Sequence, residues 1–237
     1  KTFAQLLPER YEDSDFRQQF SRIVSDEVDR LNKIIDNINQ FAHPRKLEFQ
    51  PIDIRQPIKR GLDMALQGNA RGGIWVDTAI DDKLPQVSGD ERALTECFAH
   101  LIANAAEALA RHDNPRIVLS AKAYRDSEIP SGVAVSVQDN GRGIAPDMKS
   151  KVFSPFCTTK ARGMGLGLPI VKRTVIDHNG RVCLESGDRG TCVTLVLPAV
   201  KAKSPPPPDE SALNEPAVIP PKQTPAAEPA AGTHPVA

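Results

Sequence analysis

Apolar side chains recur every three or four positions between residues 16 and 42, which is the period of an amphipathic helix. Their spacing predicts one long helix with a heptad-like seam, broad enough for a four-helix bundle. We expect Asp13, Ser14 or Asp15 to cap its start and Pro44 to end it. A shorter helix over residues 1–7 is predicted to break at Pro8. The seam consists of Phe20, Val24, Val28, Leu31, Ile35, Ile38 and Ala42.

Residues 47–200 alternate between strand and helix patterns. The predicted strands cover 47–54, 73–80, 116–124, 133–138, 181–186 and 191–197, the last two forming a hairpin. The predicted helices cover 57–70, 90–110 with Asp90 as the cap, and 168–178 ending at Asn179-Gly180. This mixed order predicts an α+β fold, a two-layer α/β sandwich preceded by a partial helical hairpin.

The chain therefore divides into three parts: a helical hairpin over 1–46, a globular domain over 47–200 and a tail over 201–237. The tail holds 10 of the 21 prolines, four of them in a row. Such a segment cannot form a core, so we expect a disordered tail. A ligand for a proline-recognising domain is the alternative.

Composition excludes several classes of function. The chain has 30 basic and 30 acidic side chains and only 5% aromatic residues, which argues against a nucleic-acid-binding surface. No apolar run is long enough to cross a bilayer, and no signal peptide is visible. The four cysteines lack metal-binding spacing. Cys183 and Cys192 could face each other across the hairpin, but reduced thiols in the cytoplasm are the favoured interpretation.

Three segments carry residues that suit a nucleotide site. Asp139 ends a predicted strand and begins the sequence DNGRGI, where a buried carboxylate can accept a hydrogen bond from an exocyclic amine. The sequence GMGLGL over 163–168 opens a helix whose first N–H groups can bind phosphate. Asn104 interrupts an apolar helix, with His100 and Glu107 on the same face, which indicates an ion site. Each signal is weak alone, but their order along the chain is specific.

At these residues the chain resembles the ATP-binding catalytic domain of sensor histidine kinases, of the nitrogen-regulation-like, PAS-type subgroup. The Bergerat-type fold of these kinases is shared with DNA gyrase, Hsp90 and MutL. The segments HLIANAAEAL, DNGRGI, VFSPFCTTK and GMGLGL resemble the N, G1, F and G2 boxes, and GDRGT resembles the last glycine box. The stretch NQFAHPRKLEFQPIDI is similar to the exit from the dimerisation hairpin.

The resemblance implies ATP and Mg²⁺ as cofactors and assigns roles to residues. Asn104 would coordinate Mg²⁺, and His100 would contact phosphate or Mg²⁺-bound water, although its place is often held by Glu or Asn. Asp139 would bind the adenine amine. Phe153 and Phe156 would anchor a lid between Ile144 and Gly163. The other residues implied at the nucleotide are Gly141, Gly143 and Thr191 near the base, Lys160, Arg162, Gly165 and Gly167 at the phosphates, and Thr159, Leu166 and Leu168 beside them.

The resemblance also implies partners and a reaction. The domain would transfer the ATP γ-phosphoryl group to a histidine for relay to a response-regulator receiver domain, as part of a homodimer formed by the hairpin. The family's phosphoacceptor motif matches no segment here, and His43, His112, His178 and His234 are interpreted as structural or solvated. We expect a cytoplasmic domain, whose parent could be membrane-anchored. A non-kinase ATPase of the same fold and a catalytically silent dimerising scaffold remain alternatives.

Overall fold

The computed structural model describes residues 3–42, 46–66, 73–110, 112–160 and 163–200. The predicted tail over 201–237, Pro44 and Arg162 lie outside these residues. No helix in the described part of the chain is both long enough and apolar enough to cross a membrane.

Two helices come first, α1 (Phe3–Arg10) and α2 (Ser14–Ala42). The Asp13 carboxylate accepts hydrogen bonds from the backbone N–H groups of Asp15 and Phe16, at 3.0 and 3.1 Å, so the predicted cap is confirmed. The predicted break at Pro8 is wrong, because α1 runs through Pro8 to Arg10. Proline removes one hydrogen bond, but its fixed φ is helical, so the next residues can continue the turn.

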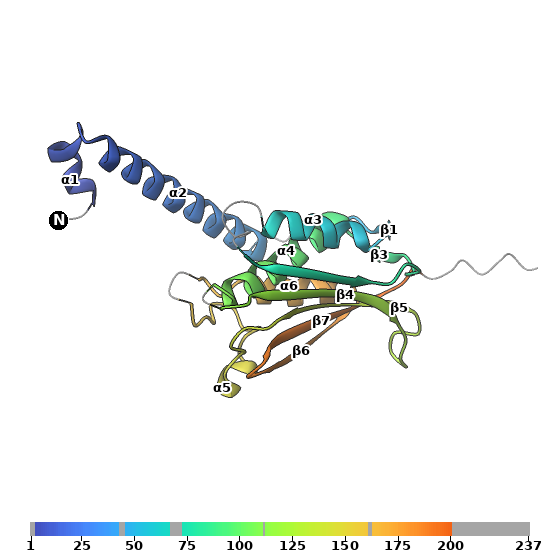
Figure 1. Ribbon diagram of the computed structural model, residues 1–237. Coiled ribbons are helices and arrows are strands. Elements are labelled where there is room, and N and C mark those ends of the chain that lie inside the picture. The colour runs from blue at the N-terminus through green and yellow to red at the C-terminus, as the bar shows by residue number, and fades with distance from the viewer. Residues whose placement is uncertain (1–2, 43–45, 67–72, 111, 161–162, 201–237) are drawn as a thin grey trace, which may run out of the picture. The chain divides into compact units, whose positions relative to one another are not determined.

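A five-stranded sheet forms one layer of the remaining structure (Figure 1). Its strand order is β2-β4-β5-β7-β6, with β2 parallel to β4 and the other pairs antiparallel. Short strands β1 (Gln50–Ile52) and β3 (Val87–Gly89) pair separately. The strands of the large sheet are β2 (Trp75–Ile80), β4 (Arg116–Tyr124), β5 (Gly132–Asp139), β6 (Arg181–Gly187) and β7 (Gly190–Pro198).

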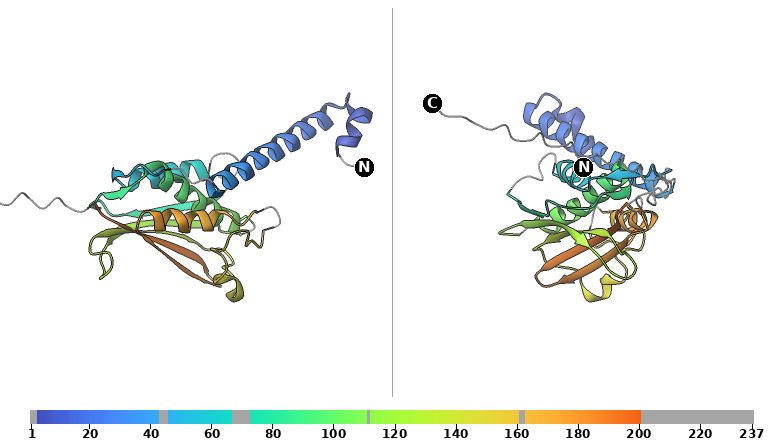
Figure 2. Two further views of the ribbon diagram at one scale, coloured as in Figure 1. Left: turned by 180° about the vertical axis from the view of Figure 1, so that it is seen from behind. Right: turned by 90° about the vertical axis from the view of Figure 1, so that its right-hand side faces the viewer.

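Helices form the second layer on one face of this sheet (Figures 1 and 2). They are α3 (Arg55–Ala65), α4 (Glu91–Ala108) and α6 (Gly167–Asp177), while the short α5 (Pro146–Lys149) follows β5. Side chains from both layers form one buried core, which includes Phe98 and Ile102 of α4 together with Leu119 and Leu195 of the sheet. The predicted two-layer α/β sandwich is therefore confirmed.

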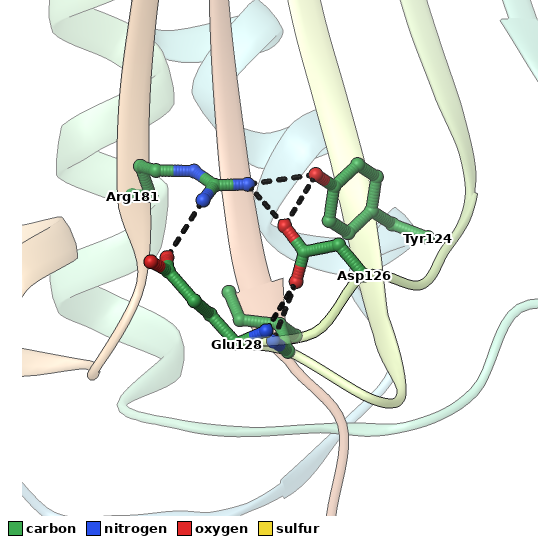
Figure 3. Close-up of polar contacts among 5 residues, drawn as sticks. Tyr124, Asp126, Glu128 and Arg181 are labelled. Atoms are coloured by element: carbon green, nitrogen blue, oxygen red, sulfur yellow. Dashed lines mark hydrogen bonds and ion pairs between the residues drawn. The ribbon is translucent and has the colours of Figure 1, made fainter.

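The opposite sheet face carries a polar cluster at the β4–β5 connection (Figure 3). The Arg181 guanidinium donates to the Tyr124 hydroxyl, Asp126 and Glu128 at 2.7, 2.6 and 2.8 Å. Hydrogen bonds to the Asp126 carboxylate hold its pKa well below the usual range. The largest contribution comes from the backbone N–H of Ile129, and smaller ones come from the side chains of Arg181 and Tyr124. Tyr124 lies at the end of β4 that is distant from Ile117, the partner of Asp139. The cluster thus fastens a connection remote from the candidate site.

The hairpin of β6 and β7 has the predicted position, but its two cysteines are not cross-strand partners. Cys183 lies opposite Thr194, and Cys192 lies opposite Glu185. Both thiols are free.

Candidate functional site

A cleft lies between α4, the turn after β5 and the segment that enters α6, and we call it the α4–α6 cleft. The residues that the sequence predicted for a nucleotide site come together there from segments far apart in the chain. Those lining the cleft are His100, Asn104, Asp139, Gly143, Ile144, Thr159, Lys160, Gly163, Gly165, Leu166, Gly167, Leu168 and Thr191.

Asp139 contributes a buried carboxylate to the lining of the cleft. Asp139 is only 6% exposed, and its Oδ1 accepts hydrogen bonds from the backbone N–H groups of Gly141 and Thr191 at 2.8 and 3.2 Å. No hydrogen bond from a described residue reaches its Oδ2. Burial raises the pKa of Asp139, and the two backbone donors oppose this shift. A buried oxygen without a protein donor is suited to an N–H group of a ligand.

The turn after Asp139 is held against the β6–β7 hairpin. The Ser186 hydroxyl accepts from the N–H of Ile144 at 2.8 Å and lies 2.9 Å from the Thr191 hydroxyl. The Lys149 ammonium donates to the Ser186 carbonyl oxygen. Gly143 has a φ of +70°, and a Cβ there would lie 2.0 Å from the Gly187 carbonyl oxygen. Only glycine fits this approach, which fixes one wall of the cleft.

A polar stripe on α4 forms the opposite wall. Asn104 Oδ1 accepts a hydrogen bond from the Lys160 ammonium at 2.9 Å, and the same ammonium forms an ion pair with Glu107. His100 lies one turn before Asn104. Burial lowers the pKa of His100, partly offset by the nearby Glu96 carboxylate, so a neutral imidazole is favoured at neutral pH. The stripe thus offers oxygens to a cation next to an uncharged ring.

The first turn of α6 closes the cleft. Its N-cap residue is Leu166, and no side chain caps the helix. Uncapped N–H groups at a helix N-terminus can bind phosphate or another anion. Gly167, the first helical residue, lies beside the polar stripe, since a Cβ there would be 3.4 Å from Asn104 Nδ2. An anion at this helix start would therefore adjoin Asn104.

Four of the predicted residues are not among the described residues that line the cleft. Gly141 and Phe156 are not among the residues that line the cleft, and Phe156 is 69% exposed, so its role in the lid stays a prediction. Phe153 is half-buried, with the Lys172 ammonium 5.8 Å from its ring centroid. Arg162 lies outside the described residues. Neither Ser186 nor Lys149 carries a specific signal in the sequence, because serine before a turn and lysine on a surface helix are common.

Among the described residues, no group of three or more His, Cys, Asp or Glu side chains is arranged to hold a metal ion. Mg²⁺ is commonly bound by one or two protein oxygens together with substrate phosphates. Asn104 Oδ1 suits the role of such a protein oxygen, because it already accepts a hydrogen bond from a cation, the Lys160 ammonium. The buried Oδ2 of Asp139 and the uncapped α6 start fit the amine and phosphates of an adenine nucleotide.

Comparison with known proteins agrees with this geometry. Residues 89–201 match the model of the family described as histidine kinase-, DNA gyrase B-, and HSP90-like ATPase. The chain is 33% identical over 199 residues to the sensor histidine kinase ZraS of Escherichia coli K12, covering 84% of this chain and 41% of ZraS. It is 35% identical over 204 residues to the sensory histidine kinase/phosphatase NtrB of Azospirillum brasilense, covering 82% and 50%.

A solved structure shows the same fold. The histidine kinase ThkA, crystallised in complex with the response regulator protein TrrA, superposes with a TM-score of 0.64 at 23% identity. The match covers 85% of this chain and 58% of ThkA. The chain thus spans about half the length of the curated relatives it matches.

Proposed function

Because residues 89–201 belong to the histidine kinase-, DNA gyrase B-, and HSP90-like ATPase family, we propose that this chain is the ATP-binding catalytic part of a two-component sensor histidine kinase. It transfers the γ-phosphoryl group of ATP to a histidine outside these 237 residues. The phosphoryl group then passes to an aspartate of a response-regulator receiver domain. A homodimer formed through α2 and a cytoplasmic location, where ATP is available, complete the proposal.

The observation that carries the proposal is one cleft that is lined both by Asp139, whose Oδ2 accepts no hydrogen bond from a described residue, and by the uncapped start of α6. In this assignment Asp139 accepts a hydrogen bond from the adenine amine. Thr191 and Gly141 hold the carboxylate in place. The first turn of α6 and Lys160 face the phosphates. A nucleotide carries both groups that this assignment needs, a base with an amine and a phosphate chain.

Asn104 would hold Mg²⁺ through Oδ1, and a bound Mg²⁺ would neutralise phosphate charge during phosphoryl transfer. The protein's own contribution is positioning and charge. The first-turn N–H groups of α6 orient the phosphates, and Lys160 offsets their charge. His100, kept neutral by burial, can donate or accept a hydrogen bond there without adding charge.

The two alternatives are less well supported. A water-activating carboxylate at the position of His100 in α4 would favour a non-kinase ATPase. This chain instead has an imidazole there, whose neutral form is favoured by burial. A silent scaffold would not need a buried carboxylate oxygen to which no described residue donates, because such an oxygen destabilises the nucleotide-free protein. The named relatives are sensor histidine kinases, and ThkA was crystallised with a response regulator, which supports the same partner class here.

The substitution Asp139→Asn tests the adenine assignment. Asparagine keeps an oxygen for Gly141 and Thr191 but turns an N–H₂ group toward the amine, so ATP affinity should fall about 10- to 100-fold, the worth of a charged hydrogen bond. Inosine triphosphate lacks this amine. Wild-type protein should therefore bind ATP more tightly than inosine triphosphate, and the variant should lose this preference, as measured by calorimetry with Mg²⁺ present.

Nucleotide-free stability provides an independent check on the same variant. Since burial raises the folded-state pKa of Asp139, its contribution to stability is present below the unfolded pKa and lost as pH rises through the folded pKa. At pH 7 the carboxylate therefore costs stability, and Asp139→Asn should melt at the same or a higher temperature. Asp113→Asn on the exposed surface is the control. An unchanged preference for ATP over inosine triphosphate would refute the assignment.

A further inference from the structure

The Lys160 ammonium occupies the oxygen of α4 to which the proposed function assigns a metal ion. Its Nζ lies 2.9 Å from Asn104 Oδ1 and is paired with the Glu107 carboxylate. The Lys160 side chain is 36% exposed and that of Glu107 60%. A cationic group of the protein therefore stands where a bound cation is expected.

Lys160 and Mg²⁺ would repel each other if both were held at this oxygen. Mg²⁺ binds oxygen at about 2.0–2.1 Å in a demanding octahedral geometry. An ammonium hydrogen-bonded to the same oxygen would place a second positive charge next to the metal and take up one of the two lone pairs of that oxygen. The two cations must therefore compete for Asn104.

We propose that Lys160 is a built-in cation that takes the metal's position on Asn104 when Mg²⁺ is absent and leaves it when Mg²⁺ binds. This rests on the proposed function for Asn104 and goes beyond it, because it makes part of the nucleotide affinity independent of the metal. The charge is well placed for this role. Asn104 adjoins Gly167 at the uncapped start of α6, so the ammonium lies near the expected phosphates.

Glu107 is a positioning residue in this arrangement. Its carboxylate accepts a hydrogen bond from the Lys160 ammonium and so holds that ammonium beside Asn104. Because exposed ion pairs contribute little to stability, the pair can open when a divalent ion arrives. An exchangeable cation needs this kind of weak hold, since a buried and fully enclosed pair would block the metal.

The test is a comparison of ATP affinity with Mg²⁺ and with EDTA for the full chain and for Lys160→Met. Removing Mg²⁺ should weaken ATP binding by the variant about tenfold more than binding by the wild type, because the variant lacks the substitute cation. For Glu107→Gln, the ratio of ATP affinities in Mg²⁺ and in EDTA should lie between the ratio of the wild type and that of Lys160→Met. Using the ratio cancels any effect of charge that is common to both buffers.

Lys149→Met is the matched control, because this ammonium lies in the same cleft but donates to the Ser186 carbonyl oxygen instead of Asn104. Its ratio between the two buffers should equal that of the wild type. If Lys160→Met also shows the wild-type ratio, or a smaller one, Lys160 does not replace the metal and the inference is wrong. If the wild type binds no ATP in Mg²⁺, the proposed function is wrong as well. Failure of the proposed function can therefore be told apart from failure of the inference about Lys160 alone.

Discussion

At the scale of single residues, the glycines of the segment 163–167 have two different tasks. The sequence predicted that they expose backbone N–H groups to phosphate, and Gly167 at the α6 start lies where this is possible. Gly165 has another constraint. Its φ is +67°, and a Cβ there would lie 2.6 Å from the backbone nitrogen and oxygen of Cys157. This glycine lets two chain segments touch, a need that depends on backbone conformation and cannot be identified from residue type.

Gly165→Ala should therefore destabilise the protein by about 1–3 kcal/mol, through a left-handed conformation and a backbone overlap. Gly187→Ala is the control, because a Cβ at Gly187 meets nothing within 4 Å. It should change the free energy of unfolding by less than about 0.5 kcal/mol. Urea denaturation of both variants measures the difference. Equal stability of the two variants would show that the contact between Gly165 and Cys157 is not maintained in solution.

Individual site residues were predictable where their chemistry conflicts with their surroundings. Asn104 inside an apolar helix and Asp139 at a strand end both line the cleft. Ser186 was not predictable, since its value lies in meeting Ile144, 42 residues away in the chain. The resemblance assigns Phe156 to the lid, and its exposed position in the structure leaves that role a prediction.

At the scale of elements, long and strongly patterned segments were predicted well. Strand β4 has the predicted bounds, and α4 begins after Asp90, whose side chain accepts from the N–H of Ala93. The strand predicted over 47–54 contains only the three residues of β1, and β3 was not predicted. Three residues are too few to show a period, so such strands are recognised only from their partner.

His178 was interpreted as a solvated histidine at a helix end, and this is wrong, because it is 1% exposed. Its Nε2 accepts from the backbone N–H of Asp90 at 3.0 Å, so Nδ1 must carry the proton that it shares with the Thr174 carbonyl oxygen at 2.7 Å. The ring centroids of Phe49 and His178 are 5.0 Å apart. The neutral ring thus joins the end of α6 to the start of α4.

This arrangement predicts a pH dependence of stability. Burial lowers the pKa of His178, although the Thr174 carbonyl and the charges of Asp90 and Asp177 oppose the shift. The unfolded chain therefore takes up a proton near the ordinary histidine pKa while the folded protein does not. The contribution of His178 is present above that pH and lost as pH falls below it.

Urea unfolding at pH 5 and pH 7.5 measures this effect. His178→Gln keeps an acceptor for Asp90 but cannot take up a proton, so its stability should fall less between the two pH values than that of the wild type, by roughly 1 kcal/mol. The exposed His112→Gln should retain the wild-type difference. An unaltered difference in His178→Gln would show that the ring does not titrate with folding.

At the scale of the whole molecule, the predicted division of the chain into hairpin, domain and tail stays a prediction. The domain over 47–200 builds a complete core, whereas α2 keeps much of its apolar seam exposed. Val24, Val28, Leu31, Ile35 and Ile38 are 43–54% exposed. A regular apolar seam on a long helix favours pairing with other helices, and a second copy of α2 supplies an identical seam.

The homodimer can be tested by placing charge on this seam. Leu31→Glu combined with Ile35→Glu changes the net charge by two negative units and should weaken self-association at least tenfold, because a carboxylate buried in a helical interface loses its hydration. Arg22→Glu makes the same change in charge on the opposite face of α2, where it should leave association intact. Sedimentation velocity over a range of protein concentrations measures the association, and circular dichroism checks that α2 remains helical. If the seam variant associates as the wild type does, or the wild type is monomeric throughout, α2 does not form the dimer.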